Sequence, residues 1–175
     1  MPQSVLALRI LFDWQGLTLE NLAELTAGLD IRNVRWLARN HPNNQTRENL
    51  FRLSNVVVGE RTVLNTGLFI YCYEPRVTIG KFCALAANIS LVTESNPNMS
   101  ELGELDFVQE RFIKSGNITI EDHAWLGANV IVFPGVTIGH HAIVGAGSIV
   151  TSDVPPGVVV KGQPARISQS LVLPN

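Results

Sequence analysis

The chain has 175 residues, of which 46% are hydrophobic and 16% charged, and its formal net charge is −2. This composition supplies ample apolar side chains for a core and excludes a disordered chain. The small net charge and the absence of a long basic run argue against a nucleic-acid partner. No apolar run reaches the ~18 residues of a membrane span, and no signal-peptide pattern is evident, so we expect a cytoplasmic protein without membrane contact.

Residues 1–54 are predicted to form an N-terminal helical arm. Thr18 can cap a first helix whose leucines recur at helical spacing, and Asp30 can cap a second helix. The polar run at residues 40–44 is typical of a turn, and we expect Thr46 to open a third, short helix. We expect the arm to cover the open end of the domain that follows. The alternative is that it also lines the binding site of a neighbouring subunit.

Aliphatic residues recur at every sixth position through residues 55–167, which we expect to form one domain. The clearest run of these anchors is Ile120, Leu126, Val132, Ile138, Val144 and Val150. A small or aliphatic residue also lies two positions before each anchor. A period of six fits neither a helix nor a single strand. It is typical of a parallel β-helix in which three hexapeptides make one coil, so that every anchor points into a shared interior.

Two interruptions break this period: Glu74-Pro75-Arg76 adds three residues and shifts the register, and residues 94–116 form one long insertion. Leu102, Leu105 and Val108 within it have loose helical spacing. Long loops on a regular scaffold commonly carry function, so this insertion is the first candidate for acceptor binding. After the last motif, residues 168–175 are expected to form a C-terminal tail.

The two cysteines, Cys72 and Cys83, are eleven residues apart and lack CxxC spacing. We expect both to be free thiols of a reducing compartment. Cys83 falls on an inward-facing position two residues before the anchor Leu85, which favours a structural thiol over a reactive one.

Five segments in the last third of the chain form a recognisable series. They read Trp125-Leu126-Gly127-Ala128-Asn129-Val130, Pro134-Gly135-Val136-Thr137-Ile138-Gly139, Val144-Gly145-Ala146-Gly147-Ser148, Asp153-Val154-Pro155-Pro156 and Gly162-Gln163-Pro164-Ala165-Arg166. Together they resemble the hexapeptide-repeat acyltransferases, and within them the maltose, galactoside and xenobiotic O-acetyltransferase branch. The resemblance implies a mainly β protein, a single-stranded left-handed parallel β-helix that carries the helical arm and the inserted loop. It also implies a homotrimer, with acetyl-CoA lying between two subunits.

The resemblance further implies which residues would bind the acetyl-CoA. They are Ala128, Ala146, Thr151, Ser152, Lys161 and Arg166. The two alanines would contact the cofactor through their backbones, and plain turn geometry is the competing explanation for both. Arg166 matches the family's arginine near the nucleotide phosphates. Ser152 stands where the family often has lysine, and Lys161 is a candidate to replace that charge.

The chain departs from the family at the general base, the residue that takes the proton of the attacking acceptor. Family members have a histidine followed by proline shortly after a Val-Thr strand end. Here the sequence is Val92-Thr93-Glu94-Ser95-Asn96-Pro97, which places Asn96 at the matching position. An amide cannot accept a proton usefully near neutral pH. Three explanations remain open. Another residue such as Glu94 acts as the base, the acceptor is an amine that needs less assistance from a base, or the protein no longer catalyses.

Two functions therefore remain open. The first is a CoA-dependent acyltransferase that moves an acetyl group from acetyl-CoA to a sugar or another small hydroxylated acceptor. The second is a catalytically weak or inactive β-helix trimer that binds a ligand or a partner. Asn96 is the feature that separates the two.

His123 and His141 are eighteen residues apart, which is one coil of three hexapeptides. They should occupy equivalent positions on successive coils, ~5 Å apart. A metal pair is an alternative, as in the zinc-dependent carbonic anhydrases of β-helix fold. Those enzymes place two histidines five residues apart, whereas here Ala128 and Ala146 occupy the positions five residues on. We therefore favour exposed corner histidines, with the edge of the CoA groove as another possibility, and expect no metal.

Overall fold

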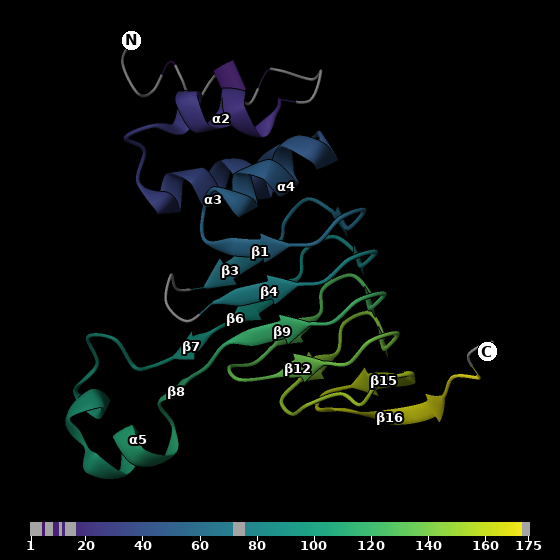
Figure 1. The fold of residues 1–175 in the computed structure, drawn as a ribbon. Coiled ribbons are helices and arrows are strands. Elements are labelled where there is room, and N and C mark those ends of the chain that lie inside the picture. The colour runs from purple at the N-terminus through teal and green to yellow at the C-terminus, as the bar shows by residue number, and fades with distance from the viewer. Residues whose placement is uncertain (1–4, 6–8, 11, 13–16, 72–75, 173–175) are drawn as a thin grey trace.

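The structure, a computed structural model, describes residues 5, 9–10, 12, 17–71 and 76–172 of the chain. In this part of the chain, helices are stacked on the N-terminal end of a parallel β-helix (Figure 1). An insertion projects from the side of the β-helix, and a hairpin lies at its C-terminal end. Glu74 and Pro75, which belong to the expected shift of register, lie outside the described residues, as does Cys72, one of the two expected free thiols.

Three helices lie at the N-terminal end: α2 (Leu19–Thr26), α3 (Ile31–Asn40) and α4 (Asn44–Arg52). Thr18 caps α2 as predicted, because its hydroxyl accepts a hydrogen bond from the Asn21 backbone N–H at 3.2 Å. Asp30 caps α3 as predicted, because its carboxylate accepts one from the Arg32 backbone N–H at 2.8 Å. Both side chains satisfy donors that a helix leaves unpaired at its start.

The third helix begins earlier than the sequence indicated, and the prediction for Thr46 was wrong. Asn43 is the capping residue, since its side chain accepts from the Thr46 backbone N–H at 3.1 Å, and α4 begins at Asn44. Thr46 lies within the first turn, fully buried, and its hydroxyl accepts from the Leu17 backbone N–H at 2.9 Å. Asparagine and threonine both cap helices well, so the sequence did not distinguish them.

The strands of the β-helix form three parallel sheets within the described residues. Sheet A contains β1 (Val56–Val58), β4 (Val77–Ile79), β9 (Ile118–Ile120) and β12 (Thr137–Ile138). Sheet B contains β2 (Val63–Leu64), β5 (Ala84–Leu85), β10 (Trp125–Leu126), β13 (Ile143–Val144) and β15 (Val158–Gly162). Sheet C contains β3 (Phe69–Tyr71), β6 (Ser90–Val92), β11 (Ile131–Val132) and β14 (Ile149–Val150). Successive strands along the chain belong to successive sheets, so each coil contributes one strand to each face.

The aliphatic anchors form columns in the interior, which confirms the six-residue register. The column of sheet B consists of Leu64, Leu85, Leu126, Val144 and Val160, each at most 3% exposed. Leu126 pairs with Val144, eighteen residues further along the chain, as three hexapeptides to a coil require. The architecture fits the left-handed β-helix that the family resemblance implies.

The arm supplies hydrogen bonds to the first coil, whose strands lack a preceding coil. The guanidinium of Arg47 donates to the Leu64 carbonyl at 2.6 Å, and the side chain of Asn44 accepts from the Leu64 N–H at 3.0 Å. Arg52 donates to the Val58 carbonyl at 3.2 Å. Arg47 is only 4% exposed, and this burial lowers the pKa of its guanidinium. Side chains of α4 thus take the place of a strand ladder at this end.

The insertion leaves the β-helix after β6 and returns at β9. Its two ends pair as antiparallel strands, β7 (Glu94–Ser95) and β8 (Lys114–Ser115), and the Gly116 N–H donates to the Thr93 carbonyl at 3.0 Å. Beyond this neck lie a 3₁₀ turn, η1 (Glu101–Glu104), and a short helix, α5 (Asp106–Arg111). Figure 1 shows the insertion projecting away from the coils. The closed neck lets the chain leave the coil without disturbing the columns.

A C-terminal hairpin ends sheet B. Strand β15 pairs with β13 in parallel and with β16 (Ala165–Ser170) in antiparallel fashion, with Lys161 opposite Arg166. The six-residue period did not predict β16, because this strand contributes no anchor to the interior. The hairpin is tied to the last coil by the Gly162 N–H, which donates to the Ser148 hydroxyl at 3.1 Å.

The columns make a direct prediction for Ile138, which is fully buried in sheet A. Ile138→Asp would place a carboxylate among aliphatic side chains without a partner, at a cost of about 3–5 kcal/mol of unfolding free energy. Thermal and urea denaturation should show this loss. Val57→Asp is the matched control, because Val57 is 53% exposed on the outer face of the same sheet. An equal effect of the two changes would contradict the assigned register.

Candidate functional site

A hollow of about 350 Å³ lies where the insertion meets the outer face of sheet C. Its walls are the outward side chains of β3, β6 and β11 together with the first residues of the insertion: Phe69, Tyr71, Ser90, Val92, Glu94, Ser95, Asn96 and Ile131. The two predicted catalytic residues, Glu94 and Asn96, therefore lie in one hollow. Phe69 and Tyr71 were missed, although their places beside the anchor Ile70 identified them as outward-facing residues.

Glu94 and Asn96 are in direct contact. The Asn96 side-chain amide donates to a carboxylate oxygen of Glu94, and its carbonyl oxygen accepts from the Asn98 backbone N–H at 2.8 Å. Both side chains are half-buried. Because the nitrogen and the oxygen of its side-chain amide are both hydrogen-bonded, Asn96 can hold the Glu94 carboxylate in one orientation. The carboxylate, unlike the amide, can accept a proton.

The two alanines predicted to bind the cofactor lie at the same corner, between sheets B and C, on successive coils. The Gly147 N–H donates to the Ala128 carbonyl at 2.8 Å, which joins the two corners. Gly127 packs so closely on the next coil that a Cβ there would lie 2.6 Å from the Ala146 nitrogen. Only glycine fits at this point, so the corner packing requires Gly127 independently of any ligand.

The predicted charged residues lie beside Ala146. Lys161 and Arg166 are opposite each other on β15 and β16, and both are exposed. The Gln163 side chain donates to the Gly147 carbonyl at 2.7 Å, which ties the hairpin to the corner that carries Ala146. The structure thus places Ala146, Lys161 and Arg166 in one region.

The other two predicted cofactor residues lie elsewhere. Thr151 and Ser152 are exposed at the next corner, directly after β14, and in the described part of the chain no hydrogen bond joins them to the hairpin.

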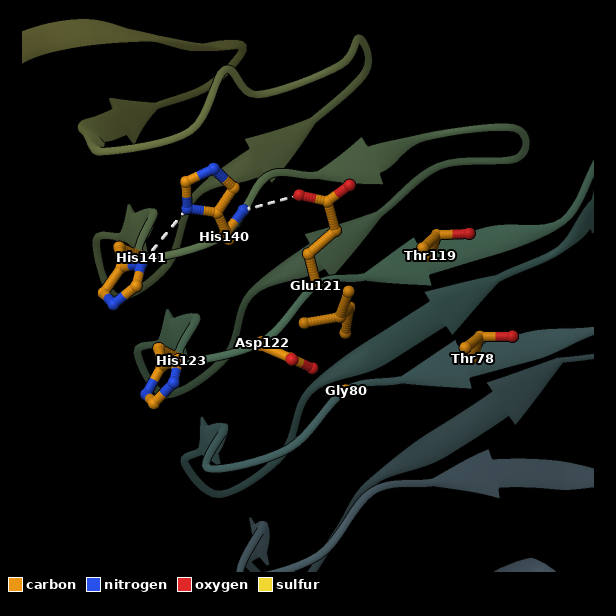
Figure 2. A pocket seen from close by; sticks show the side chains of 9 residues that line it. Thr78, Gly80, Thr119, Glu121, Asp122, His123, His140 and His141 are labelled. Carbon is orange, nitrogen blue, oxygen red and sulfur yellow. Dashed lines mark hydrogen bonds between the residues drawn. The ribbon is translucent and has the colours of Figure 1, made fainter.

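A second hollow, of about 550 Å³, lies on the outer face of sheet A (Figure 2). Its walls include Thr78, Thr119, Glu121 and the histidines His123, His140 and His141. The rings of His123 and His141 are stacked with centroids 4.6 Å apart and planes 9° apart. This confirms that the two residues occupy equivalent positions one coil apart.

The histidine stack continues into the preceding coils, which the spacing of the two histidines did not predict. The Phe82 ring stacks on His123 with a centroid distance of 5.0 Å, and the Arg61 guanidinium lies 5.7 Å from the Phe82 centroid. All four residues occupy the left-handed backbone region, with φ between 55° and 62°. Each coil therefore places one planar group at this corner.

His140 lies beside the stack and contacts His141. Their Nδ1 atoms are 3.1 Å apart, so one ring donates and the other accepts. The His140 backbone N–H donates to the Glu121 carboxylate at 2.8 Å, as Figure 2 shows. Among the described residues, no three side chains of histidine, cysteine, aspartate or glutamate are grouped as ligands for a metal ion. These contacts describe a packed corner of the scaffold.

Cys83 is an interior residue, as its sequence position predicted. It is 1% exposed, its thiol donates to the Glu121 carbonyl at 3.1 Å, and burial raises its pKa. A buried thiol with a raised pKa is rarely a thiolate at neutral pH, so Cys83 has a packing role.

Comparisons with known proteins agree with this geometry. Residues 117–152 match the family model described as hexapeptide repeat of succinyl-transferase. The galactoside O-acetyltransferase of Escherichia coli strain K12 is 38% identical over 121 residues, which are 67% of this chain and 55% of that protein. The chain spans about half the length of the curated relatives it matches.

Solved structures show the same architecture over most of the chain. A hexapeptide-repeat acetyltransferase of Vibrio cholerae aligns with a TM-score of 0.65 and 25% identity, covering 94% of this chain and 98% of that one. A galactoside acetyltransferase in complex with coenzyme A aligns with a TM-score of 0.55 and 24% identity, covering 98% and 92%.

Over most of its length, the chain is similar in sequence and fold to the hexapeptide-repeat acyltransferases. In the described residues, no helix is both long and apolar enough to cross a membrane.

Proposed function

We propose that the chain transfers the acetyl group of acetyl-CoA to a hydroxyl of a sugar or another small hydroxylated acceptor. The observation that carries this proposal is the half-buried Glu94 carboxylate, which Asn96 holds at the wall of a hollow on sheet C. The name of the galactoside O-acetyltransferase relative supports a sugar acceptor. In this proposal, residues 94–116 supply the base and residues 55–167 form the scaffold that the arm, residues 1–54, closes at one end.

The proposed chemistry needs one base. Glu94 accepts the proton of the acceptor hydroxyl as its oxygen attacks the thioester carbonyl. A carbon–oxygen bond forms, the carbon–sulfur bond breaks, and the thiol of coenzyme A leaves with a proton. Asn96 is a positioning residue that acts through Glu94. Neighbouring N–H groups would stabilise the negative charge that develops on the carbonyl oxygen.

The competing proposal is a catalytically weak or inactive trimer that binds a ligand or partner. The observation that favours it is the amide of Asn96, which donates a hydrogen bond to Glu94 at the position where the resemblance implies a base. The two proposals differ in whether acetyl transfer depends on Glu94.

Glu94→Gln is the decisive variant. It removes the proton acceptor with little change in shape, so we expect thiol release from acetyl-CoA in the presence of a galactoside to fall ~10²–10⁴-fold. Glu101→Gln, an exposed change in the same insertion, is the matched control. Asn96→His should restore part of the rate in the Glu94→Gln background, because it returns a base to the hollow. Full activity of Glu94→Gln, with acetyl-CoA binding unchanged in calorimetry, would contradict the assignment.

We further propose that acetyl-CoA lies along the corner of Ala128 and Ala146, with its phosphates near Lys161 and Arg166. The support is the position of these exposed cations on the hairpin tied to the Ala146 corner. Guanidinium and ammonium groups favour phosphate oxygens. Thr151 and Ser152, at the next corner, would contact a different part of the same cofactor.

Ser152→Lys should strengthen the binding of coenzyme A. An added exposed charge contributes about 0.2–1 kcal/mol, which corresponds to a decrease in Kd of about 1.5–5-fold. Calorimetry at low and high salt measures the effect, which should shrink as salt rises. Ser115→Lys, an exposed change in the insertion, is the control. If both variants gain equally, the gain reflects net charge alone and Ser152 lies outside the site.

We also propose that the chain forms a closed homotrimer in the cytoplasm. Large apolar side chains are exposed on the outer face of sheet B, including Trp125 at 54% and Val63 at 44%. Exposed apolar surface of this kind marks subunit interfaces. Sedimentation equilibrium should give three times the mass of one chain, and Trp125→Lys should dissociate the assembly. A monomer that persists at high concentration would exclude the trimer.

A further inference from the structure

A third hollow, of about 130 Å³, lies between α3 and the first coil of the β-helix. We call it the arginine hollow and define it by Arg32, Arg35, Trp36, Arg39 and Phe69, which all line it. The first four residues recur along α3 at spacings of three, one and three residues, so they lie on one helix face. Three cations on one face are notable in a chain whose net charge is −2.

The three arginines differ in what they contact. Arg32 forms an ion pair with Asp30 at 2.8 Å. Arg35 is 7% exposed, and its guanidinium donates to the Ser54 carbonyl at 2.9 Å. Arg39 is exposed, and its guanidinium lies 5.1 Å from the centroid of the Phe69 ring. No carboxylate of the described residues forms an ion pair with Arg39. Its charge is therefore available to a ligand.

The arginine hollow and the hollow that contains Glu94 share one wall residue. Phe69 lines both, because it projects outward from β3 between α3 and the insertion. The Phe69 and Tyr71 rings are 6.1 Å apart, and Tyr71 lines the same hollow as Glu94. The Arg39 guanidinium, the two aromatic rings and the proposed base therefore line two neighbouring hollows that meet at Phe69.

The charges in the two hollows are opposite, and this polarity favours one orientation of a bound molecule. An anionic group would be repelled by the Glu94 carboxylate and attracted by Arg39. A guanidinium also matches the paired oxygens of a carboxylate or phosphate. Trp36 is 55% exposed and Phe69 is 39% exposed, so aromatic surface lies beside the cation. Such rings present flat apolar faces, on which the face of a sugar ring that carries C–H groups can pack.

We propose that the acceptor is an anionic saccharide, whose carboxylate or phosphate binds Arg39 while one of its hydroxyls reaches Glu94. This inference rests on the proposed acetyl transfer and specifies its substrate class. Arg39 is a binding and specificity-determining residue in this arrangement, and it takes no part in the proton transfer. The carboxylate of a sugar acid and the phosphate of a sugar phosphate share the chemistry that Arg39 recognises.

The test compares galactose, galacturonate and galactose 6-phosphate as acceptors with the full chain and acetyl-CoA. We expect kcat/KM to be at least tenfold higher for one of the anionic acceptors than for galactose. The better of the two identifies the anionic group. Arg39→Gln should lower the ratio of anionic to neutral kcat/KM about tenfold or more, mainly through KM, because a charge-assisted hydrogen bond is lost. Arg39→Lys should retain part of the preference, and rising salt should reduce it.

Arg61→Gln is the matched control. Arg61 also lies over an aromatic ring, that of Phe82 at 5.7 Å, but at the corner between sheets A and B. It should leave both kcat/KM values unchanged. Melting temperatures of all variants separate lost folding from lost recognition, and Arg39→Lys keeps the test valid if Arg39→Gln is unstable.

Calorimetric binding of the three sugars to Glu94→Gln separates this inference from the proposed function. Binding of an anionic sugar that requires Arg39, without transfer in the native chain, would support the arginine hollow and reject the acetyl transfer. Transfer that is equally efficient with galactose and its anionic forms, and unaffected by Arg39→Gln, would overturn the inference alone.

Discussion

Each inward-facing side chain of this β-helix lies directly over its equivalent in the next coil, and most of the structure depends on that stacking. A single coil cannot bury its own apolar side chains, so the hydrophobic free energy arises between coils. A column such as Leu64, Leu85 and Leu126 leaves no room for an additional residue. Additional chain must therefore leave at a corner and return to the same corner. The neck formed by β7 and β8 does this for the insertion.

The same constraint explains why the sequence predicted the scaffold so well. An anchor such as Val132 is specified by its own apolar side chain and by its spacing, and both can be read from the sequence. The caps at Thr18 and Asp30 were predictable for a similar reason, since each involves a contact within a few residues. Strand β16 was not predictable, because it lies outside the columns and is held by pairing with β15. The start of α4 was predicted wrongly because Asn43 and Thr46 are both good capping residues.

The candidate site was predictable only in part. Contacts between residues close in sequence were predicted, whereas contacts between distant parts of the chain were not. Glu94 and Asn96 are two residues apart, so their contact is local. Phe69 belongs to the preceding coil and Arg39 to the arm, and they join the site only because the folded arm lies against β3. The stack of Phe82, His123 and His141 was likewise predicted only in part. The spacing of His123 and His141 is one regular coil, whereas Phe82 precedes His123 by a coil that contains the insertion.

The side chains of α4 that satisfy the first coil have a further consequence, for assembly. The last strand of a parallel β-helix presents unpaired backbone groups to which another copy of the chain can add. At the N-terminal end, Arg47 and Asn44 already occupy the carbonyl and the N–H of Leu64. At the other end of sheet B, the antiparallel β16 reverses the strand direction, so a further parallel coil cannot continue the pairing. Both ends of this sheet are thereby closed to end-to-end growth, which keeps a repetitive, aliphatic fold from extending into filaments.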